Sequence, residues 1–588
     1  MFVTFALQQP QFSYAIPSAV MSTRQTVKSH KLARNSVVRF TVPYDTPSPP
    51  TSAPRHERQA VMENPWLPPD DLEMGLDVDT TQCEKALASD YVDLTQELAR
   101  KLAEEKKKKK KKRSLASSRP MLLWKKSFRD IYLGELLRSE GRGDVWDKGD
   151  TKCFDCRARK SEQPNVGVFR CRDCFIPHLT CKDCCVRRHR MLPFHNIEQW
   201  TGSTFIKSSL KKLGLRIQLN HTGMACSKPE ACHSKFVILH TNGIHQVNVD
   251  YCGCRPVPKI RQLLRRGLYP ASQENPRTCA TFSLLDHMHM LSLTSKCSTY
   301  DYYKALEKLT NNTGINLPHS KYRPLSRMLL QWRHLKMLKR AGRGHDRNGI
   351  AGTKDGELAV LCPSCPHPGI NLPDKWQEAS ASERFLYAVI LCMDANFRLK
   401  NQLVSNYSVD PGLGRGWSYT VSREPFEEYV RSRINDVDVD GDESKGCGLQ
   451  AVEQANTKYN KGLRYTGVTA VSCGRSEMVM PCSVGNLHKG EKYANMDFGF
   501  ASTLRFFIGL MLIIVSYDAA CQWFVKYAKR VRDYWPKGLK PPPTQTFLAV
   551  IPKMHEEGHK KTKNHEQFSF NLTPGVGHTD GECPERIW

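Results

Sequence analysis

The sequence lacks long apolar runs and a recognisable export signal. Its longest apolar stretch, residues 506–515, has about half the length that a membrane-spanning helix needs. Residues 1–20 carry neither a basic start nor a long apolar centre, so they do not resemble a secretory signal. We therefore expect no membrane partner, and we interpret the cysteines as those of a protein in a reducing compartment.

Acidic residues are scarce relative to basic ones. The 588 residues include 59 Asp and Glu against 87 Lys and Arg, which gives a net charge of +28. This excess predicts a polyanionic partner, either nucleic acid or an acidic membrane surface. Apolar residues still make up 40% of the chain, which is enough for packed cores and excludes a wholly disordered protein. The length predicts a multidomain chain.

The composition changes along the chain. Residues 1–119 are rich in Pro, Ser, Thr and Gln and contain a run of basic residues at 106–113, so we expect disorder there. Such a run is typical of a solvated tail and also of a nuclear-import or phosphate-contacting segment, and we expect a nuclear protein. The later segments are a helix over 120–150, a zinc-binding cysteine cluster region over 151–260, a basic helical region with a Cys-Pro connector over 261–380, and an α/β core over 381–588.

Half of the 22 cysteines lie between Cys153 and Cys254, and many are two residues apart. This spacing is typical of metal sites rather than disulfide frameworks, because a Cys-x2-Cys turn points both thiolates at one ion. We predict two closed, structural zinc sites, with interleaved sharing of the pairs as one arrangement. Their ligands are Cys153, Cys156, Cys171, Cys174, Cys181, Cys184, His189 and His195.

A second set of cysteines follows the first block. Four more thiolates predict a third zinc site, and the alternative is a set of buried free thiols. These residues are Cys226, Cys232, Cys252 and Cys254. A weaker candidate is Cys362-x2-Cys365 with His367, which has no clear fourth ligand nearby.

Two apolar segments each end in an aspartate. Residues 387–393 lead to Asp394, and residues 506–515 lead to Asp518. Together with a late glutamate, two strand-end aspartates suit a centre that binds a pair of Mg²⁺ ions and cleaves phosphodiesters. Strand-end acids are also common without such a role, so the pattern alone leaves both interpretations open.

The sequence motifs around these acids resemble those of the Kyakuja–Dileera–Zisupton (KDZ) transposases. They are Met-Asp-Ala-Asn-Phe-Arg-Leu at 393–399, Ser-Tyr-Asp-x-Ala-Cys-Gln-Trp at 516–523, and Gly-x-Thr-Asp-Gly-Glu-x-x-Glu-Arg-x-Trp at 577–588. The block through Cys254 resembles the CxC2-like cysteine cluster associated with that family. The resemblance covers roughly residues 120–588. It implies a DDE transposase with a ribonuclease-H-like core, which hydrolyses transposon ends and joins their 3′-hydroxyls to target DNA.

The resemblance also implies roles for the acids. Asp394 and Asp518 would be the first two Mg²⁺ ligands. For the third ligand the resemblance favours Glu585, with Glu582 as the close alternative, and Asp497 is an outside candidate for the second acid. Because the chain as given ends three residues after Glu585, we expect an incomplete core at the C-terminus.

The family pattern further implies a metal pair at His555 and His559, for which the alternative is a polar helix face. The sequence departs from the pattern in several places: Ser476 stands where a His is expected, and His565 lies near an expected Cys. In addition, His578 replaces an expected Arg, and Cys583-Pro584 replaces a Gly-apolar pair.

Two functions remain as hypotheses at this point. The first is a Mg²⁺-dependent DNA transposase or a derivative of one, with transposon ends, target DNA and further copies of the chain as its partners. The second is a non-catalytic zinc protein, derived from a transposase, that binds DNA, chromatin or another protein.

Overall fold

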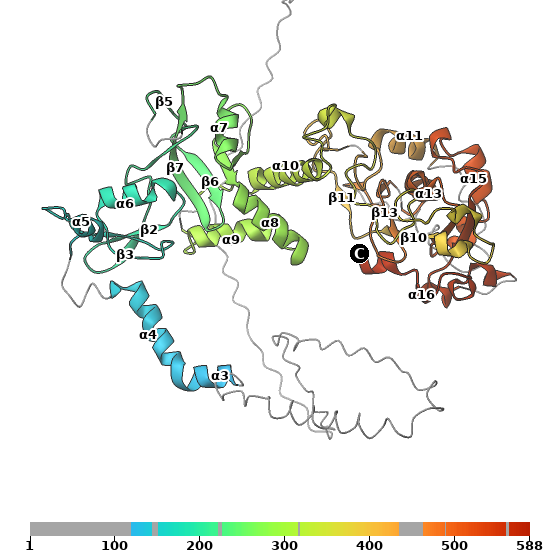
Figure 1. The fold of residues 1–588 in the computed structure, drawn as a ribbon, viewed down its shortest axis with the longest axis horizontal. Helices are drawn as coiled ribbons and strands as arrows, with labels where there is room; N and C mark the ends of the chain where they lie inside the picture. Colours follow the sequence, from blue (N-terminus) through green and yellow to red (C-terminus); the bar gives the residue numbers. More distant parts are fainter. Residues whose placement is uncertain are drawn as a thin grey trace, which may run out of the picture. The chain divides into compact units, whose positions relative to one another are not determined.

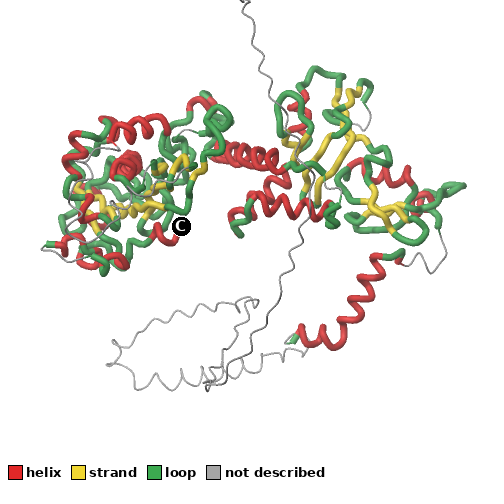
Figure 2. The backbone as a smooth tube through the Cα atoms, turned by 180° about the vertical axis from the view of Figure 1, so that it is seen from behind, coloured by secondary structure: helices red, strands yellow, loops and turns green. Residues whose placement is uncertain are grey.

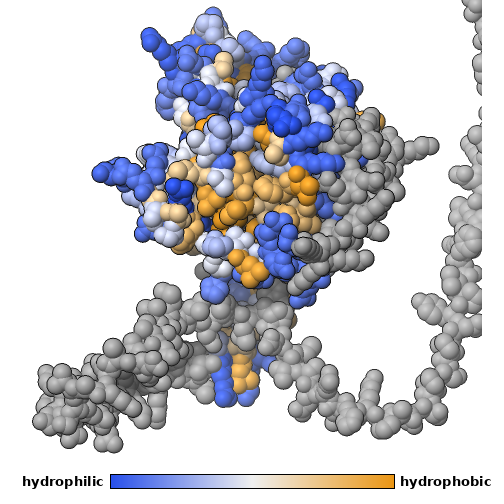
Figure 3. Space-filling view, turned by 90° about the vertical axis from the view of Figure 1, so that its right-hand side faces the viewer, coloured by the Kyte–Doolittle hydropathy of each residue, from blue (hydrophilic) through white to orange (hydrophobic). Residues whose placement is uncertain are grey.

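The computed structural model describes residues 119–143, 151–221, 226–315, 318–414, 416–433, 462–488, 490–559 and 564–587. The predictions for residues 1–118, including the basic run, lie outside the described residues. Among the described residues, no helix combines the length and the apolar character needed to cross a bilayer. On the face that Figure 3 presents, apolar side chains gather into a patch bordered by hydrophilic ones.

The segment expected to be helical begins with α3 (Pro120–Leu123), passes through a π-helical turn (Trp124–Phe128) and continues as α4 (Arg129–Glu140). A proline in the first turn suits a helix start because its missing N–H would be unpaired there anyway. At the other end, the guanidinium of Arg170 donates to the carbonyl oxygens of Ser139, Glu140 and Gly141. A cation at this end satisfies carbonyls that have no partner within the helix.

The cysteine-rich segment forms a small antiparallel sheet with short helices beside it. Its elements are α5 (Phe154–Ala158), β1 (Phe169–Cys171), α6 (Lys182–Arg188), a 3-10 turn (His189–Met191), β2 (Ile197–Trp200) and β3 (Phe205–Ser208), with strand order β1-β2-β3. Apolar packing is limited to a few residues such as Ile197 and Leu210. A separate buried cluster consists of cysteines alone.

A second sheet follows, with strand order β4-β7-β6-β9-β8 and β5 paired to β7. Its strands are β4 (Arg216–Gln218), β5 (Pro229–Ala231), β6 (Phe236–His240), β7 (Gly243–Cys252), β8 (Leu268–Pro270) and β9 (Thr278–Thr281). The helices are α7 (Lys259–Arg265), α8 (Phe282–Thr294), α9 (Thr299–Thr310) and α10 (Tyr322–Arg340). Helices α8, α9 and α10 pack against one another and against this sheet (Figure 1).

This sheet crosses the boundary that we predicted at residue 260. Strand β9 lies beyond that boundary, yet it pairs in parallel with β6. The region expected to be only helical therefore contributes two strands. Both are too short for periodicity to separate them from the neighbouring helices.

The C-terminal region contains a five-stranded mixed sheet of order β14-β13-β10-β15-β16. The strands are β10 (Val389–Asn396), β13 (Gly467–Cys473), β14 (Gly485–Leu487), β15 (Leu512–Ser516) and β16 (Thr546–Val550). Strands β10, β15 and β16 run parallel, whereas β13 is antiparallel to both β10 and β14. Strands β11 (Asn401–Gln402) and β12 (Leu463–Tyr465) form a separate ribbon. Helices and loops surround the strands (Figure 2).

The helices of this region are α11 (Arg423–Arg433), α13 (Tyr493–Leu504), α14 (Ala520–Trp523), α15 (Tyr527–Asp533), α16 (Lys553–Glu556) and α17 (Cys583–Ile587). Every residue of α13 is buried, including Asp497. Its carboxylate accepts from Nε of Arg530 at 2.8 Å and from Nε1 of Trp523 at 2.7 Å. These contacts make Asp497 a structural anchor of the core, so we no longer consider it for the second acid.

Candidate functional site

The strand register brings two of the predicted acids to one edge of the sheet. In the parallel pair β10–β15, Cys392 lies opposite Ser516. Asp394 and Asp518 each follow two residues later, so both lie at the carboxyl ends of adjacent strands. In open α/β sheets, this edge is where ligands bind.

Asp518 has charged neighbours that bear on its chemistry. Burial raises the pKa of its carboxyl group, an N–H donated by Ala519 lowers it, and His555 acts in the same direction. The carboxylate of Glu585 raises that pKa again, which means that the late glutamate lies within electrostatic reach of Asp518. Two carboxylates held near each other repel unless a cation stands between them.

The two late glutamates have different surroundings. Glu585 is exposed on α17, whereas Glu582 is buried with 3% of its surface accessible. Oε1 of Glu582 accepts the backbone N–H of Met554 at 2.8 Å, and Oε2 lies 3.4 Å from Nδ1 of His555. Glu582 therefore holds the start of α16, while Glu585 remains available to a ligand.

Helix α17 is fixed to the sheet from two sides. The thiol of Cys583 interacts with that of Cys392 on β10. Arg586 donates to Asp580 at 2.7 Å and also pairs with Glu477. These contacts fix the helix that carries Glu585 beside the strand that carries Asp394.

The first cysteine block divides into two interleaved groups of four donors. One consists of Cys153, Cys156, Cys181 and Cys184, all buried, with Sγ of Cys156 3.9 Å from that of Cys181 and 3.6 Å from that of Cys184. Thiolates bound to zinc at about 2.3 Å in a tetrahedron lie roughly 3.8 Å apart. The donor positions thus fit a zinc ion, which the first and third Cys pairs would share.

The other group consists of Cys171, Cys174, His189 and His195. Nδ1 of His195 lies 3.4 Å from Sγ of Cys171 and 3.5 Å from Sγ of Cys174. Nδ1 of His189 contacts the carbonyl oxygen of Cys185 at 2.7 Å, which directs Nε2 toward Cys174. A backbone contact of this kind fixes the tautomer of a metal-binding histidine.

The third group requires a correction. It consists of His221, Cys226, Cys252 and Cys254, without the predicted Cys232. The Sγ of Cys232 instead contacts the hydroxyl of Tyr251 at 3.6 Å, beside the apolar core of the second sheet. Hydrogen bonds from Ser227, His221 and Cys226 lower the pKa of the Cys254 thiol to about 5, which favours the thiolate that a metal needs. Counting only cysteines overlooked the histidine.

Further groups with three donors each occur among the described residues of the C-terminal region, and one of them involves β13. Cys362 and Cys365 meet Cys473 at the end of β13, and the hydroxyl of Ser476 lies 2.9 Å from Sγ of Cys362. The spacing Cys362-x2-Cys365 had indicated two of the three donors, but the third lies more than a hundred residues away in the sequence.

The second three-donor group is Cys521, His559 and His565. Sγ of Cys521 lies 3.5 Å from Nδ1 of His559, and Nε2 of both histidines is buried without a hydrogen bond among the described residues. The structure places the two predicted histidines in different surroundings, because Nδ1 of His555 lies 3.4 Å from Oε2 of Glu582 whereas His559 lies beside Cys521. Since Cys521 follows Asp518 by three residues, this group lies close to the second acid in the chain.

Comparisons with known families agree with this arrangement. The Kyakuja-Dileera-Zisupton transposase model matches residues 387–588. The model of the CxC2 like cysteine cluster associated with KDZ transposases matches residues 210–314. The chain therefore carries the two regions of a KDZ transposase with its associated cysteine cluster. No curated protein and no solved structure matches it.

The matched ranges divide the chain into regions that correspond to the donor groups and the acids. All four predicted acids, from Asp394 to Glu585, fall within the KDZ match. The CxC2 match contains His221 and the cysteines of the third group, together with the second sheet and helices α8 and α9. The two interleaved groups precede residue 210, so they form a module on the N-terminal side of that match.

Proposed function

We propose that this chain cleaves transposon DNA ends and transfers them to target DNA in a reaction that depends on Mg²⁺. The carrying observation is that the register aligns Asp394 with Asp518 at one sheet edge, with Glu585 within electrostatic reach of Asp518. The reaction would take place on DNA in the nucleus.

The topology supports the same proposal. Strands β10, β13 and β14 form an antiparallel meander, and β15 and β16 extend it in parallel on the other side of β10. The order β14-β13-β10-β15-β16 is therefore 3-2-1-4-5 within this sheet. That is the arrangement of a ribonuclease-H-like core, with one acid on the central first strand and one after the fourth. Helix α17 would then supply the third acid from across the sheet edge.

The donor set fits Mg²⁺, which prefers carboxylate oxygens and retains water ligands. Asp394, Asp518 and Glu585 would hold the metal, and when bound it would activate the attacking oxygen and stabilise the leaving one. The other residues have positioning roles. Glu582 and His555 fix the start of α16, and Arg586 fixes α17.

Zinc would serve a structural role in this proposal. The three groups of four donors leave no open corner for a reacting ligand, which is typical of structural sites. The interleaved groups would hold the small sheet β1-β2-β3, and the third group would join the end of β7 to the segment before β5.

A nicking assay tests the proposal. The zinc-loaded full chain is incubated with a plasmid that carries the genomic sequences flanking its gene, in Mg²⁺ or in EDTA. We expect nicks that require Mg²⁺ and that fall at least about a hundredfold in D394N and in D518N, because each change removes a charge from the metal site. The control D533N changes an exposed aspartate on α15 and should cleave normally. Cleavage that survives D394N would refute the assignment, and DNA binding without cleavage would favour the non-catalytic hypothesis.

A further inference from the structure

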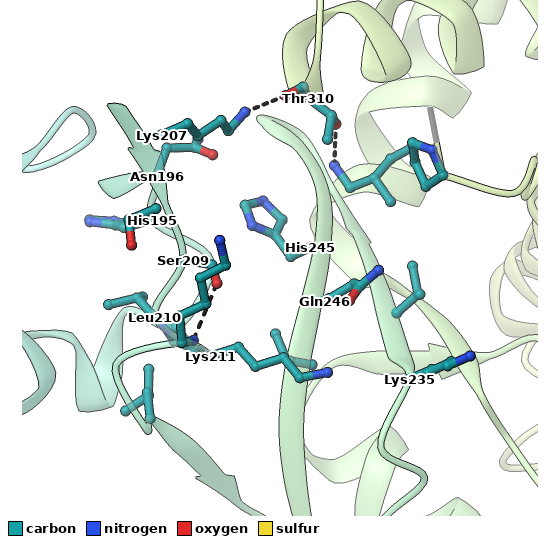
Figure 4. Close-up of a pocket in the computed structure, with 18 of the residues that line it drawn as sticks. His195, Asn196, Lys207, Ser209, Leu210, Lys211, Lys235, His245, Gln246 and Thr310 are labelled. Atoms are coloured by element: carbon teal, nitrogen blue, oxygen red, sulfur yellow. Dashed lines mark hydrogen bonds between the residues drawn. The ribbon is translucent and has the colours of Figure 1, made fainter. Parts of the chain in front are cut away.

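A cavity of about 850 Å³ lies beside the interleaved zinc module, between β3 and the turn that follows it, the β6–β7 hairpin, and the end of α9 (Figure 4). Its lining includes five lysines and no aspartate or glutamate. The lysines are Lys207, Lys211, Lys212, Lys235 and Lys321. They come from segments that are far apart in the sequence, so the fold concentrates their charge.

Two of these lysines are held in place by backbone oxygens. The ammonium of Lys207 donates to the carbonyl oxygen of Thr310 at the end of α9, and that of Lys211 donates to the carbonyl oxygen of Ser234. Neutral acceptors orient the side chains without cancelling their charge. Within the described part of the chain, none of the five pocket lysines forms an ion pair.

One histidine of the polar wall is uncharged at neutral pH. His245 points into the cavity (Figure 4), and burial lowers the pKa of its imidazole to about 4. Its Nε2–H donates to Oδ1 of Asn242 at 2.8 Å, and the amide of Asn242 in turn donates to the carbonyl oxygen of Phe194 at 2.9 Å. His245 therefore adds no charge to that of the five lysines.

The rest of the lining indicates which part of a polyanion would enter. Aliphatic side chains such as Leu210, Ile217 and Val247 are present, but the lining contains no Phe, Tyr or Trp. Proteins that hold unpaired bases stack them on aromatic rings. Flexible ammonium groups around a cavity without such rings suit phosphate oxygens instead.

We propose that this lysine pocket binds the backbone phosphates of DNA and anchors the transposase on its substrate without reading sequence. The inference rests on the proposed function only in taking DNA as the partner. The second interleaved group would help to shape this pocket, because His195 is one of its donors and also lines the pocket.

The test measures binding of a fluorescent duplex of arbitrary sequence to the zinc-loaded full chain between 50 and 200 mM salt. The variant K212Q/K235Q/K321Q changes the three lysines without a side-chain hydrogen bond among the described residues, so the fold should persist. We expect about tenfold weaker binding at 100 mM salt. The slope of log K against log salt should fall by about 1 for each lysine that contacts a phosphate.

The matched control is K182Q/K296Q/K308Q, which removes the same charge from lysines outside the lining and should bind almost as the parent does. The charge-preserving K212R/K235R/K321R should restore binding. Equal losses in the pocket and control triples would show a diffuse effect of charge and would overturn the proposal. So would a pocket triple that keeps DNA but loses a polyglutamate probe, because the ligand would then be an acidic peptide.

The two proposals fail separately. If the parent cleaves DNA yet the pocket triple binds DNA as tightly as the parent does, the phosphate site is refuted and the transposase function stands. If the pocket triple loses binding but the parent never cleaves, the phosphate site stands and the catalytic proposal fails.

Discussion

The cysteine-rich module and the C-terminal core solve the same folding problem by different means. In the module, one buried cluster consists of Cys153, Cys156, Cys181 and Cys184 with no apolar side chain among them. In the core, one large apolar cluster surrounds the sheet and includes aromatic side chains such as Phe426, Phe500 and Trp523. A segment with so little apolar surface to bury needs a metal or a disulfide to fold, whereas the core does not.

The number of metal donors follows the same division. Three groups between Cys153 and Cys254 have four donors each, whereas the groups around Cys473 and Cys521 in the described part of the C-terminal core have three each. In the module the metal donors take the place of an apolar interior, so the loss of one donor would leave few other contacts to stabilise the fold. In the core the thiols lie among packed apolar residues, so the fold does not depend on a metal bound to them.

The largest expected effect is therefore the removal of zinc. A zinc-selective chelator should unfold the module, because structural zinc supplies on the order of 10 kcal/mol of folding free energy. Hydrogen exchange followed by mass spectrometry should show β1 and β2 losing protection while β10 and β15 keep theirs. A matched pair of variants separates ligand loss from thiol loss. C156S should behave like the chelated protein, whereas C185S, a buried thiol outside the groups of donors, should not. Simultaneous loss of protection in both regions would refute the contrast.

The second prediction concerns the interior of the core. D497N should leave the guanidinium of Arg530 buried beside an uncharged partner and lower the free energy of unfolding by about 3–5 kcal/mol. Urea denaturation of the core, followed by tryptophan fluorescence, would measure it. D533N removes an exposed partner of Arg532 and should leave the midpoint unchanged. Similar midpoints for the two variants would mean that the core does not depend on this buried pair.

The sequence was sufficient to predict the family resemblance and those metal donors that lie a few residues apart. The pairs Cys153-x2-Cys156 and Cys181-x2-Cys184 could be recognised because a short turn brings both thiols together. Which pairs share an ion could not be predicted, since the sharing depends on how β1 and α6 pack. The same limit explains the exchange of Cys232 for His221, because β5 and β7 pair in a register that directs Cys232 toward Tyr251.

Long-range pairing also limited the prediction of the catalytic site. The sequence indicated that Asp394 and Asp518 follow apolar segments. Only the parallel register of β10 and β15 shows that the two acids lie at the same edge of the sheet. The roles of Glu582 and Glu585 differ through burial, which a spacing of three residues on one short segment does not reveal.

The third prediction compares these two glutamates. E582A removes the acceptor for the N–H of Met554 and should destabilise the core by about 1–3 kcal/mol. E585A should leave stability unchanged, because that side chain is exposed, but should abolish Mg²⁺-dependent nicking. Thermal unfolding and the nicking assay, performed on both variants, separate the two roles. If E582Q abolishes nicking at unchanged stability and E585Q does not, Glu582 is the third metal ligand.

The smallest expected effect concerns zinc binding in the core, and it tests whether a group of three thiols there can become a four-donor site like those of the module. The hydroxyl of Ser476 already lies 2.9 Å from Sγ of Cys362, so S476C would place a thiolate at the fourth corner of the group with Cys365 and Cys473. We expect zinc to be retained in that group about tenfold more tightly, a gain of about 1.4 kcal/mol. Competition with a chelator, read by zinc content per chain, measures the gain, and S502C supplies a buried thiol elsewhere as the control. If S476C gains no zinc, the three thiols of the core act only as packing groups, and the contrast between the two regions is complete.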